Sequence, residues 1–337
     1  MYRALCVGLV VAASLGCFRK RDDDASSSNS TTNSSTGGSS VSSGTAGSGG
    51  SGGSGGAPVV QWDLKDSSTT VDLYGVWIDD AGATAFAVGA AGTIVRSDDG
   101  GESWQALNSN VSDDLFGVFG IGTEIYAVGE NGVILHSTDG MQFSPEDSQT
   151  GVGLHSVWAS DPMRVFVGGA GSLMLRSIDG GTTWVPRPNA ASTTITGIWG
   201  LDADTVYAVT EASLITTIDG GDQWSYEILS INAHTDVWVG AGGHIFITND
   251  GGVVTSWETD HWLKTVFGAN SAMYGIWGAS VNDLYIVGQW GLIARTGDAG
   301  VNWLSEDAGS EATLRAVHGG GGKVLAVGDG GVILRRP

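Results

Sequence analysis

Short apolar runs recur along the chain with a period of about forty residues. In the stretch Phe86–Trp104, two apolar strands flank a Gly-x-x-Gly turn, and the polar pattern Ser97-x-Asp99-x-Gly101-x-Ser103-Trp104 follows. Further versions lie at Tyr126–Phe143, Phe166–Trp184, Tyr207–Trp224, Phe246–Trp262, Tyr285–Trp303 and, in shortened form, Leu325–Pro337. Each is preceded by a short strand that ends near a marker residue, namely Trp77, Phe119, Trp158, Trp199, Trp238, Trp277 or His318. Short apolar strands and glycine turns at this period predict stacked β units.

The first repeat predicts four strands, here named A to D. They are Leu73–Ile78, Thr84–Val88, Thr93–Ser97 and Trp104–Leu107. Strands B and C are apolar on both faces, so one unit cannot be stable in water unless neighbours cover it on each side. Radial stacking satisfies this need and removes long exposed sheet edges. The sequence therefore predicts an all-β fold, a β-propeller.

The spacing of aromatic residues also predicts how the ring closes. Strand D carries an aromatic residue 14 or 15 positions before the next marker in six repeats, at Trp104, Phe143, Trp184, Trp224, Trp262 and Trp303. The last repeat ends at Pro337 without a strand D, whereas Trp62 lies 15 residues before Trp77. The N-terminal strand around Val59–Trp62 should therefore be the missing strand D. This arrangement gives seven blades within a domain that spans residues 57–337.

The polar pattern after strand C resembles the Asp box, or BNR repeat. Ser177–Trp184, Thr217–Trp224 and Thr296–Trp303 match it, Ser137–Phe143 is one residue shorter, and Ser256–Trp262 lacks the Asp. The Asp carboxylate and the Ser or Thr hydroxyl can bind backbone N–H groups of the C–D turn. We expect this structural role for Asp99, Asp139, Asp179, Asp219 and Asp298. Calcium binding is the alternative, but no loop has alternating D-x-D-x-D ligands.

The N-terminal segment is predicted to direct the chain to a bacterial cell envelope. Residues 1–16 have a positive start and an apolar run too short to span a bilayer, as in a signal peptide. The sequence Ser14-Leu15-Gly16-Cys17 resembles the lipobox of bacterial lipoproteins, which implies lipid attachment at Cys17. Residues 17–56 are rich in Ser and Gly and are expected to form a disordered tether. Phe18 in place of Asp favours the outer membrane, with the domain facing the periplasm or the cell surface.

Charge and composition exclude several classes of function. With 15 Lys and Arg against 36 Asp and Glu, the formal charge is −21, which argues against nucleic acid as a partner. The six histidines lack the spacing of metal ligands, and no Gly-rich loop precedes a helix. We therefore expect no metal and no cofactor.

A binding face is predicted from residues that break the repeat. Eleven of the thirteen Trp lie in strands A and D, and the exceptions are Trp257, in the irregular fifth hairpin, and Trp290, in a B–C turn. B–C turns and D–A loops should share one face, together with the residue three before each marker. These entrance residues vary between blades: Tyr74, Phe116, His155, Thr196, Thr235, Tyr274 and Arg315. A protein or glycan partner is expected at Tyr74, Phe116, His155, Tyr274, Trp290 and Arg315; the alternative is that the entrance residues only plug the channel.

Asp boxes also occur in sialidases and other glycosidases. A sialidase requires three converging arginines, but Arg96, Arg176, Arg295 and Arg335 share one repeat column with His136. Another glycosidase would need two carboxylates about 5 to 10 Å apart. Three pairs in D–A loops could supply them: Asp113-Asp114, Glu146-Asp147 and Glu306-Asp307. A glycosidase acting on envelope or extracellular glycans thus stays the alternative to a non-enzymatic binder, and a passive spacer is a third possibility.

The whole domain resembles the photosystem II assembly factor family of propellers. The shared pattern is G-[VI]-W, then [YF]-x-V-G-x-x-G-x-[IL], then the Asp box with its terminal Trp. Gly117–Gly132 and Gly275–Trp303 are good examples. The resemblance implies seven blades and a binder or assembly scaffold without catalytic activity. That family carries an arginine-rich patch, which has no counterpart in this acidic chain, so the resemblance does not identify the bound protein.

Overall fold

The computed structural model of the chain describes residues 62–229, 232–258, 261–266 and 271–337. The predicted signal peptide, the lipid attachment at Cys17 and the tether lie outside the described residues. Within the described residues, no helix has the length and apolar character needed to cross a membrane.

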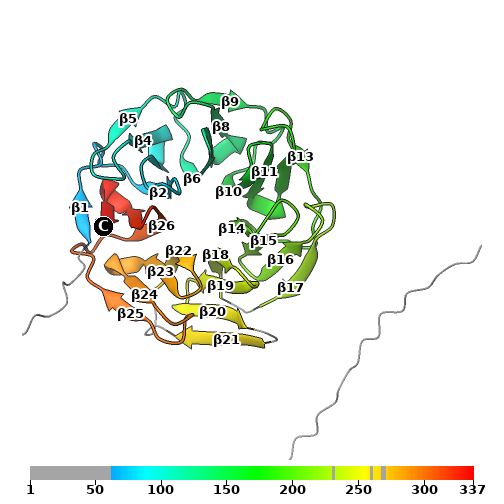
Figure 1. The fold of residues 1–337 in the computed structure, drawn as a ribbon. Coiled ribbons are helices and arrows are strands. Elements are labelled where there is room, and N and C mark those ends of the chain that lie inside the picture. The colour runs from blue at the N-terminus through cyan, green and yellow to red at the C-terminus, as the bar shows by residue number, and fades with distance from the viewer. Residues whose placement is uncertain (1–61, 230–231, 259–260, 267–270) are drawn as a thin grey trace, which may run out of the picture. The chain divides into compact units, whose positions relative to one another are not determined.

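Seven four-stranded antiparallel sheets form a closed ring (Figure 1), and a cavity opens into the central channel at each end. The A strands, nearest the channel, are β2 (Leu73–Ile78), β6 (Leu115–Ile121), β10 (Leu154–Asp161), β14 (Ile195–Gly200), β18 (His234–Gly240), β22 (Met273–Ser280) and β26 (Leu314–Gly320). The B strands are β3 (Ala85–Gly89), β7 (Glu124–Gly129), β11 (Arg164–Gly169), β15 (Val206–Thr210), β19 (His244–Asn249), β23 (Asp283–Gly288) and β27 (Lys323–Gly328). The predicted seven-bladed β-propeller is therefore confirmed.

The outer half of each blade consists of strands C and D. The C strands are β4 (Thr93–Ser97), β8 (Ile134–Ser137), β12 (Met174–Ser177), β16 (Ser213–Thr217), β20 (Val253–Glu258), β24 (Ile293–Thr296) and β28 (Ile333–Arg336). The D strands are β5 (Gln105–Leu107), β9 (Ser144–Glu146), β13 (Val185–Pro186), β17 (Ser225–Ile228), β21 (His261–Val266), β25 (Leu304–Glu306) and β1 (Asp63–Lys65). We number the blades 1 to 7 from the one that contains β2.

The N-terminal strand closes blade 7, as predicted. Strand β1 pairs with β28, with Asp63 opposite Arg335 (Figure 1). Trp62, just before β1, is 2% exposed, and its indole N–H donates to Glu306 at 2.8 Å. The indole also meets the ring of Tyr285 in blade 6 edge-on, at 6.2 Å between centroids. The two ends of the described chain therefore share one sheet, and Val59–Gln61 of the predicted strand lie outside the described residues.

Aromatic contacts join neighbouring blades. Phe143 of blade 2 meets Phe86 of blade 1 edge-on at 6.2 Å, and Trp224 of blade 4 meets Phe166 of blade 3 in the same way at 6.4 Å. Strand β3 is buried along its whole length, as the apolar faces of strand B predict. Each blade thus covers apolar surface that its neighbour would otherwise expose to water.

The Asp boxes form dense hydrogen-bond networks in the C–D turns. The Asp99 carboxylate accepts the backbone N–H groups of Glu102 and Ser103 at 3.0 and 2.9 Å, and Ser97 Oγ accepts the N–H of Gly101 at 2.8 Å. The Ser103 hydroxyl also donates to Asp99 at 2.6 Å. These bonds, chiefly those from Ser103, lower the pKa of Asp99 to about 2 because they stabilise the charged carboxylate.

The other C–D turns repeat or replace this network. Asp179, Asp219 and Asp298 accept equivalent backbone N–H groups, and in the shorter box Asp139 accepts those of Met141 and Gln142. Blade 5, without the Asp, has longer C and D strands instead, in which Trp257 pairs across from Trp262 with ring centroids 5.1 Å apart. Trp257 therefore packs within its own hairpin.

Candidate binding site at the mouth of the central channel

The D–A loops and B–C turns lie together on one face. Asp114, in the loop that leads into blade 2, accepts the N–H of Ala91 in a B–C turn at 2.8 Å. Asp72 accepts the N–H of Gly330 in the same way at 2.7 Å, across the closure of the ring. The A–B hairpins meet the Asp boxes on the other face, since Gly100 donates its N–H to Ala83 at 2.8 Å. The predicted division into two faces is correct.

All seven entrance residues line one cavity of about 150 Å³ at the channel end of the first face. Five of them, from consecutive blades, form a wall of planar groups. Tyr74 and Phe116 lie 5.7 Å apart, and Phe116 stacks on His155 at 5.0 Å between ring centroids. On the other side, the guanidinium of Arg315 lies over the Tyr274 ring at 5.0 Å. We call this wall the aromatic arc (Tyr274, Arg315, Tyr74, Phe116 and His155).

The aromatic arc offers little free positive charge. Two hydrogen bonds join Arg315 to Asp329, at 2.8 and 3.2 Å, and they raise the pKa of the guanidinium. Burial lowers the pKa of His155, which favours its neutral form near pH 7. The pKa of Tyr74 is raised by burial and by the nearby carboxylates of Asp114 and Asp72. The mouth is thus aromatic with an acidic surround.

Blades 4 and 5 interrupt the arc with two threonines. Thr196 donates its hydroxyl to the carbonyl of His234 at 3.0 Å, and Thr235 donates to that of Met273 at 2.7 Å. Both side chains are therefore hydrogen-bonded to the next blade. On this side the mouth has smaller side chains than those of the aromatic arc.

One residue that the sequence pattern did not point to follows Thr235 directly in β18. Asp236 lines the same cavity, and its carboxylate accepts the N–H groups of Val237 at 2.9 Å and Ile276 at 3.0 Å. Burial raises its pKa to about 7. The signal lay in the column two residues before each marker, which otherwise holds small residues: Gly75, Gly117, Ser156, Gly197, Gly275 and Ala316.

The marker residues form an aromatic collar in the middle of the channel, and His318 fills its centre. Its ring centroid lies 5.7 Å from Trp277 and 6.4 Å from Trp77, its neighbours in the ring, and 6.5 Å from Phe119. Its Nδ1 accepts the N–H of Ile78 at 3.3 Å. Burial lowers the pKa of His318 to about 3, so the imidazole is neutral at pH 7. A cavity of about 600 Å³, lined in part by Trp77, Trp277 and His318, opens beyond the collar.

Trp290 lies on the mouth face but outside the cavity. Its side chain is 76% exposed, and its φ of 59° is in the left-handed region, where bulky residues are rare. Other blades place Ala91, Asn131, Gly171 and Gly330 at this position of the B–C turn. The preceding residue, Gln289, donates its side-chain amide to the Tyr274 hydroxyl at 3.2 Å. The turn that carries Trp290 is thus joined to the aromatic arc.

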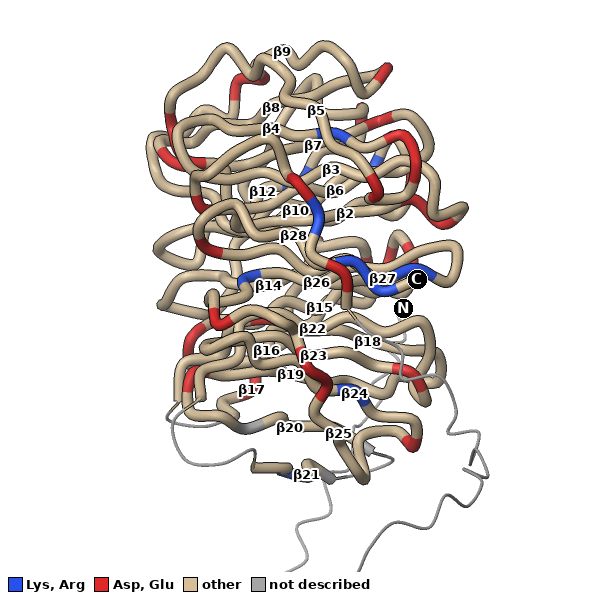
Figure 2. The backbone as a smooth tube through the Cα atoms, turned by 90° about the vertical axis from the view of Figure 1, so that its left-hand side faces the viewer, with Lys and Arg blue, Asp and Glu red and all other residues tan. Residues whose placement is uncertain are grey.

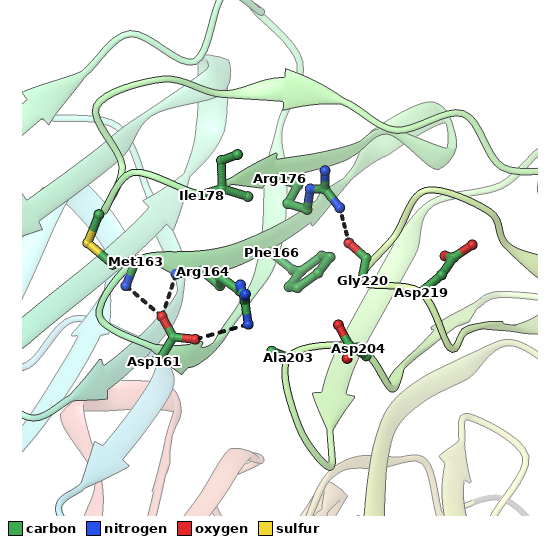
Figure 3. A pocket seen from close by; sticks show the side chains of 10 residues that line it. All are labelled: Asp161, Met163, Arg164, Phe166, Arg176, Ile178, Ala203, Asp204, Asp219 and Gly220. Atoms are coloured by element: carbon green, nitrogen blue, oxygen red, sulfur yellow. Dashed lines mark hydrogen bonds and ion pairs between the residues drawn. The ribbon is translucent and has the colours of Figure 1, made fainter.

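A groove between blades 3 and 4 lies on the opposite face (Figure 3). It measures about 520 Å³, and Figure 3 shows Phe166 between Arg164 and Gly220, with Arg176 donating to the Gly220 carbonyl. Arg96 and Arg335 make the same bond to the next Asp box, at Asp139 and Gly100. Arg96, Arg176 and Arg335 therefore tie neighbouring blades together, and the groove contains one instance of this repeated contact.

The carboxylates of the three pairs that could serve a glycosidase bind nearby groups of the protein. Asp113 accepts from Asn131, Glu146 contacts His136 at 3.4 Å, and Glu306 accepts from Trp62. Asp147 and Asp307 each accept the N–H two residues further on in their own loops. None of the six carboxylates lines the mouth cavity. In the described part of the chain, no group of three or more His, Cys, Asp or Glu is placed to hold a metal.

Two arginines of blade 3 share a partner on blade 4. Arg176 and Arg187 both contact Asp222, at 3.1 and 3.2 Å. Arg176 lies in β12 and Arg187 directly follows β13. The two share one carboxylate, so they do not form the convergent triad that a sialidase requires.

No protein family and no curated protein sequence matches the chain. Solved structures do resemble it. YCF48 bound to D1 peptide superposes with a TM-score of 0.70 at 17% identity, covering 84% of this chain and 99% of that one. YCF48 from Cyanidioschyzon merolae gives 0.67 at 18% identity, covering 82% and 98%.

Propellers of other kinds are about as similar. A catalytically inactive virginiamycin B lyase from Staphylococcus aureus, solved with quinupristin, gives a TM-score of 0.68 at 13% identity and covers 82% of this chain and 99% of that one. The WD40 propeller domain of Doa1 gives 0.67 at 13% identity, covering 82% and 97%. At these identities the likenesses establish the fold alone, and the expected similarity to the photosystem II assembly factor YCF48 holds at that level.

Proposed function

We propose that this propeller is a non-enzymatic scaffold that binds a segment of a protein partner at the channel mouth. The observation that carries the proposal is the aromatic arc, five planar side chains gathered from five blades around one cavity. Columns that only hold the blades together repeat the same residue types, whereas the entrance column has five residue types in seven blades. Such variation at a concave surface favours recognition of a specific partner.

Trp290 extends the proposed site outward. A tryptophan that is both exposed and held at positive φ reduces stability, so its presence favours a role in binding. Aromatic residues are also enriched among the side chains that dominate protein interfaces. Among the similar structures, YCF48 is a propeller bound to a peptide, which is the kind of ligand that we propose here.

The absence of catalysis is part of the proposal and is supported by the loop carboxylates. Each of the three pairs that could serve a glycosidase binds groups of its own or a neighbouring blade, outside the mouth cavity. A panel of fluorogenic glycosides tests this directly. Turnover that is lost when one of these carboxylates is replaced would contradict the proposal.

We further propose that the domain is anchored by lipid at Cys17 to a bacterial envelope, with the outer membrane as the favoured site. The support is the apolar N-terminal run and the lipobox-like Ser14–Cys17. Metabolic labelling with an alkyne fatty acid should mark the wild-type chain and not Cys17→Ser. Labelling of that variant, or release of the wild type into the soluble fraction, would contradict the anchor.

Affinity capture from an envelope extract tests the binding site. The double variant Tyr274→Ala/Trp290→Ala should lose a protein that the wild type retains, as identified by mass spectrometry. Met163→Ala/Ile178→Ala is the matched control, since it removes two exposed apolar side chains from the opposite face. If both variants capture the protein equally well, the binding site does not lie at the mouth. If capture survives protease treatment of the extract, the partner is a glycan instead of a protein.

A further inference from the structure

The carboxylate of Asp236 is placed where the other six blades have no charge. The corresponding positions are Gly75, Gly117, Ser156, Gly197, Gly275 and Ala316. The neighbouring glycine makes room for it, since a Cβ at Gly197 would lie only 2.7 Å from Asp236 Oδ1. The carboxylate is therefore enclosed between the inner strands of blades 4 and 6 while it lines the mouth cavity.

The backbone bonds of Asp236 explain an acceptor at this position but not a charge. Inner strands leave N–H groups without a partner in their own sheet, and a side chain of the preceding blade accepts some of them. In blade 3, the hydroxyl of Ser156 accepts the N–H of Ile198 at 3.1 Å. A serine is thus sufficient for the bond that Asp236 makes with Ile276, and it would avoid the free-energy penalty of a desolvated carboxylate.

None of the described residues forms an ion pair with Asp236. The other titratable groups that line the same cavity are Tyr74, His155, Tyr274, Arg315 and His318. Arg315 is the only permanent cation among them, and it is bound to Asp329. His155 and His318 are held neutral by burial, and the tyrosines carry no positive charge. The carboxylate therefore lacks the cation that usually accompanies a buried acid.

We propose that Asp236 receives the ammonium group of a lysine side chain carried by the bound partner segment. This inference rests on the binding function proposed above and names the chemistry of the bound residue. The ammonium would pass Thr196 and Thr235 and pair with the carboxylate of Asp236, while the alkyl chain of the lysine contacts the aromatic arc.

Three features favour this ligand. The cavity of about 150 Å³ suits one side chain, since an engineered cavity of roughly that size holds benzene. Aromatic rings and an acidic surround attract a cation, and an ammonium close to a ring gains cation–π energy. A partly buried ammonium also restores the charge balance of the carboxylate.

The inference makes proton release a signature of binding. With a pKa near 7, Asp236 is about half protonated in the free protein at pH 7. An ammonium that pairs with it favours the carboxylate, so the proton leaves to the buffer. A purely structural role for Asp236 gives no such release.

Isothermal titration calorimetry of the full chain with n-butylammonium, a mimic of the lysine side chain, tests the proposal. The same titration in two buffers of different ionisation enthalpy reports the protons released. We expect saturable binding in the millimolar range, at least tenfold weaker binding of 1-butanol, and release of about half a proton at pH 7. Asp236→Ser should abolish both the preference for the ammonium and the proton release, and Asp80→Asn, an exposed site on the other face, should change neither.

The outcomes separate this proposal from the binding function. Absence of saturable binding to the wild type, or equal binding and proton release in a folded Asp236→Ser or Asp236→Asn variant, would overturn the lysine site. If Tyr274→Ala/Trp290→Ala still binds butylammonium and still captures the partner, the cation site is retained and the mouth is rejected as the partner site. If partner capture is lost in Tyr274→Ala/Trp290→Ala but unchanged in Asp236→Ser, the mouth remains the partner site and the lysine site at Asp236 is rejected.

Discussion

The imidazole of His318 in blade 7 lies 6.3 Å, between ring centroids, from the indole of Trp199 in blade 4. These two blades are not neighbours, so the contact spans the hub of the propeller. Burial keeps His318 neutral at pH 7, which allows it to remain among the aromatic rings of the collar. The channel is therefore obstructed at its middle, and a partner at the mouth enters a blind cavity from one face only.

The buried imidazole predicts loss of stability in acid. Because the pKa of His318 is about 3 in the folded protein and about 6.5 when unfolded, the unfolded state binds the extra proton between these values. The free energy of unfolding should fall as the pH drops from 6.5 towards 3, by up to about 4 kcal/mol from this group. His318→Phe should weaken this dependence while losing about 1–3 kcal/mol at pH 7, since the N–H of Ile78 loses its acceptor.

Urea unfolding at several pH values measures the effect. His234, whose pKa burial lowers to about 4, contributes in the same range, so the slope should decrease rather than vanish. An unchanged difference between wild type and variant from pH 7 to pH 4 would contradict the prediction.

Most of the fold could be predicted from the sequence because the repeat carries its own packing rules. The apolar strands B and C require neighbours on both sides, and the spacing from Trp62 to Trp77 matches that of the other blades. The extent of β1 was harder to predict, because pairing with β28 defines the described strand Asp63–Lys65. Strand boundaries depend on such pairing more than on local composition.

The site was harder to predict, because its chemistry arises between blades. The entrance residues, which were predicted from one repeat column, do line one cavity, because strand A places equivalent positions at the same depth in each blade. The role of His318 as a plug was not foreseen, because the sequence does not show that its side chain reaches Phe119 and Trp199. Asp236 was overlooked for the same reason, since its burial depends on Gly197 in the preceding blade.

Because Trp62 helps to close the ring, its replacement should strongly reduce the stability of the domain. Trp62→Ala removes a 2%-exposed indole, its bond to Glu306 and its contact with Tyr285, so it should destabilise the domain by about 3–5 kcal/mol. Leu64→Ala, in the same strand but 63% exposed, should change stability by less than about 0.5 kcal/mol. Deletion of Ala57–Lys65 should lower the melting temperature by at least as much as Trp62→Ala. A deletion that melts with the full domain would contradict the closure.

An Asp box should act as a small, acid-sensitive contribution to stability. Asp99→Ala removes acceptors for two backbone N–H groups at an exposed turn, and we expect a loss of about 1 kcal/mol at pH 7, as for a helix cap. The folded pKa of about 2 is below the unfolded value of about 3.9, so the contribution is present above pH 4 and is lost towards pH 2. Chemical denaturation of both proteins at pH 7 and pH 2.5 measures this. A difference that stays constant would indicate packing rather than charge.

Trp290 should show a conflict between stability and binding. Trp290→Asn places in blade 6 the residue that blade 2 has at the same turn position, where φ is also positive. Since Asn tolerates the left-handed region and the indole is exposed, thermal unfolding should show equal or higher stability, by up to about 1 kcal/mol. Partner capture should fall, whereas Ala91→Asn in blade 1 should leave it unchanged. A clear loss of stability in Trp290→Asn would show that the indole packs on the fold.

Asp236→Ser should stabilise the free protein at neutral pH, because serine keeps an acceptor for the N–H of Ile276 without a buried charge. The folded pKa of about 7 is above the unfolded value of about 3.9, so the folded state binds the extra proton between them and the wild type loses stability as the pH rises through this range. The advantage of the variant should therefore be near zero at pH 4 and grow to a few kcal/mol by pH 8, at about 1.36 kcal/mol per pKa unit. This trend is opposite to that of His318, so each must be measured as a difference between variant and wild type in urea unfolding. A variant that is less stable by the same amount at every pH would show that the carboxylate is a structural acceptor, without the free-energy penalty that a bound lysine is proposed to relieve.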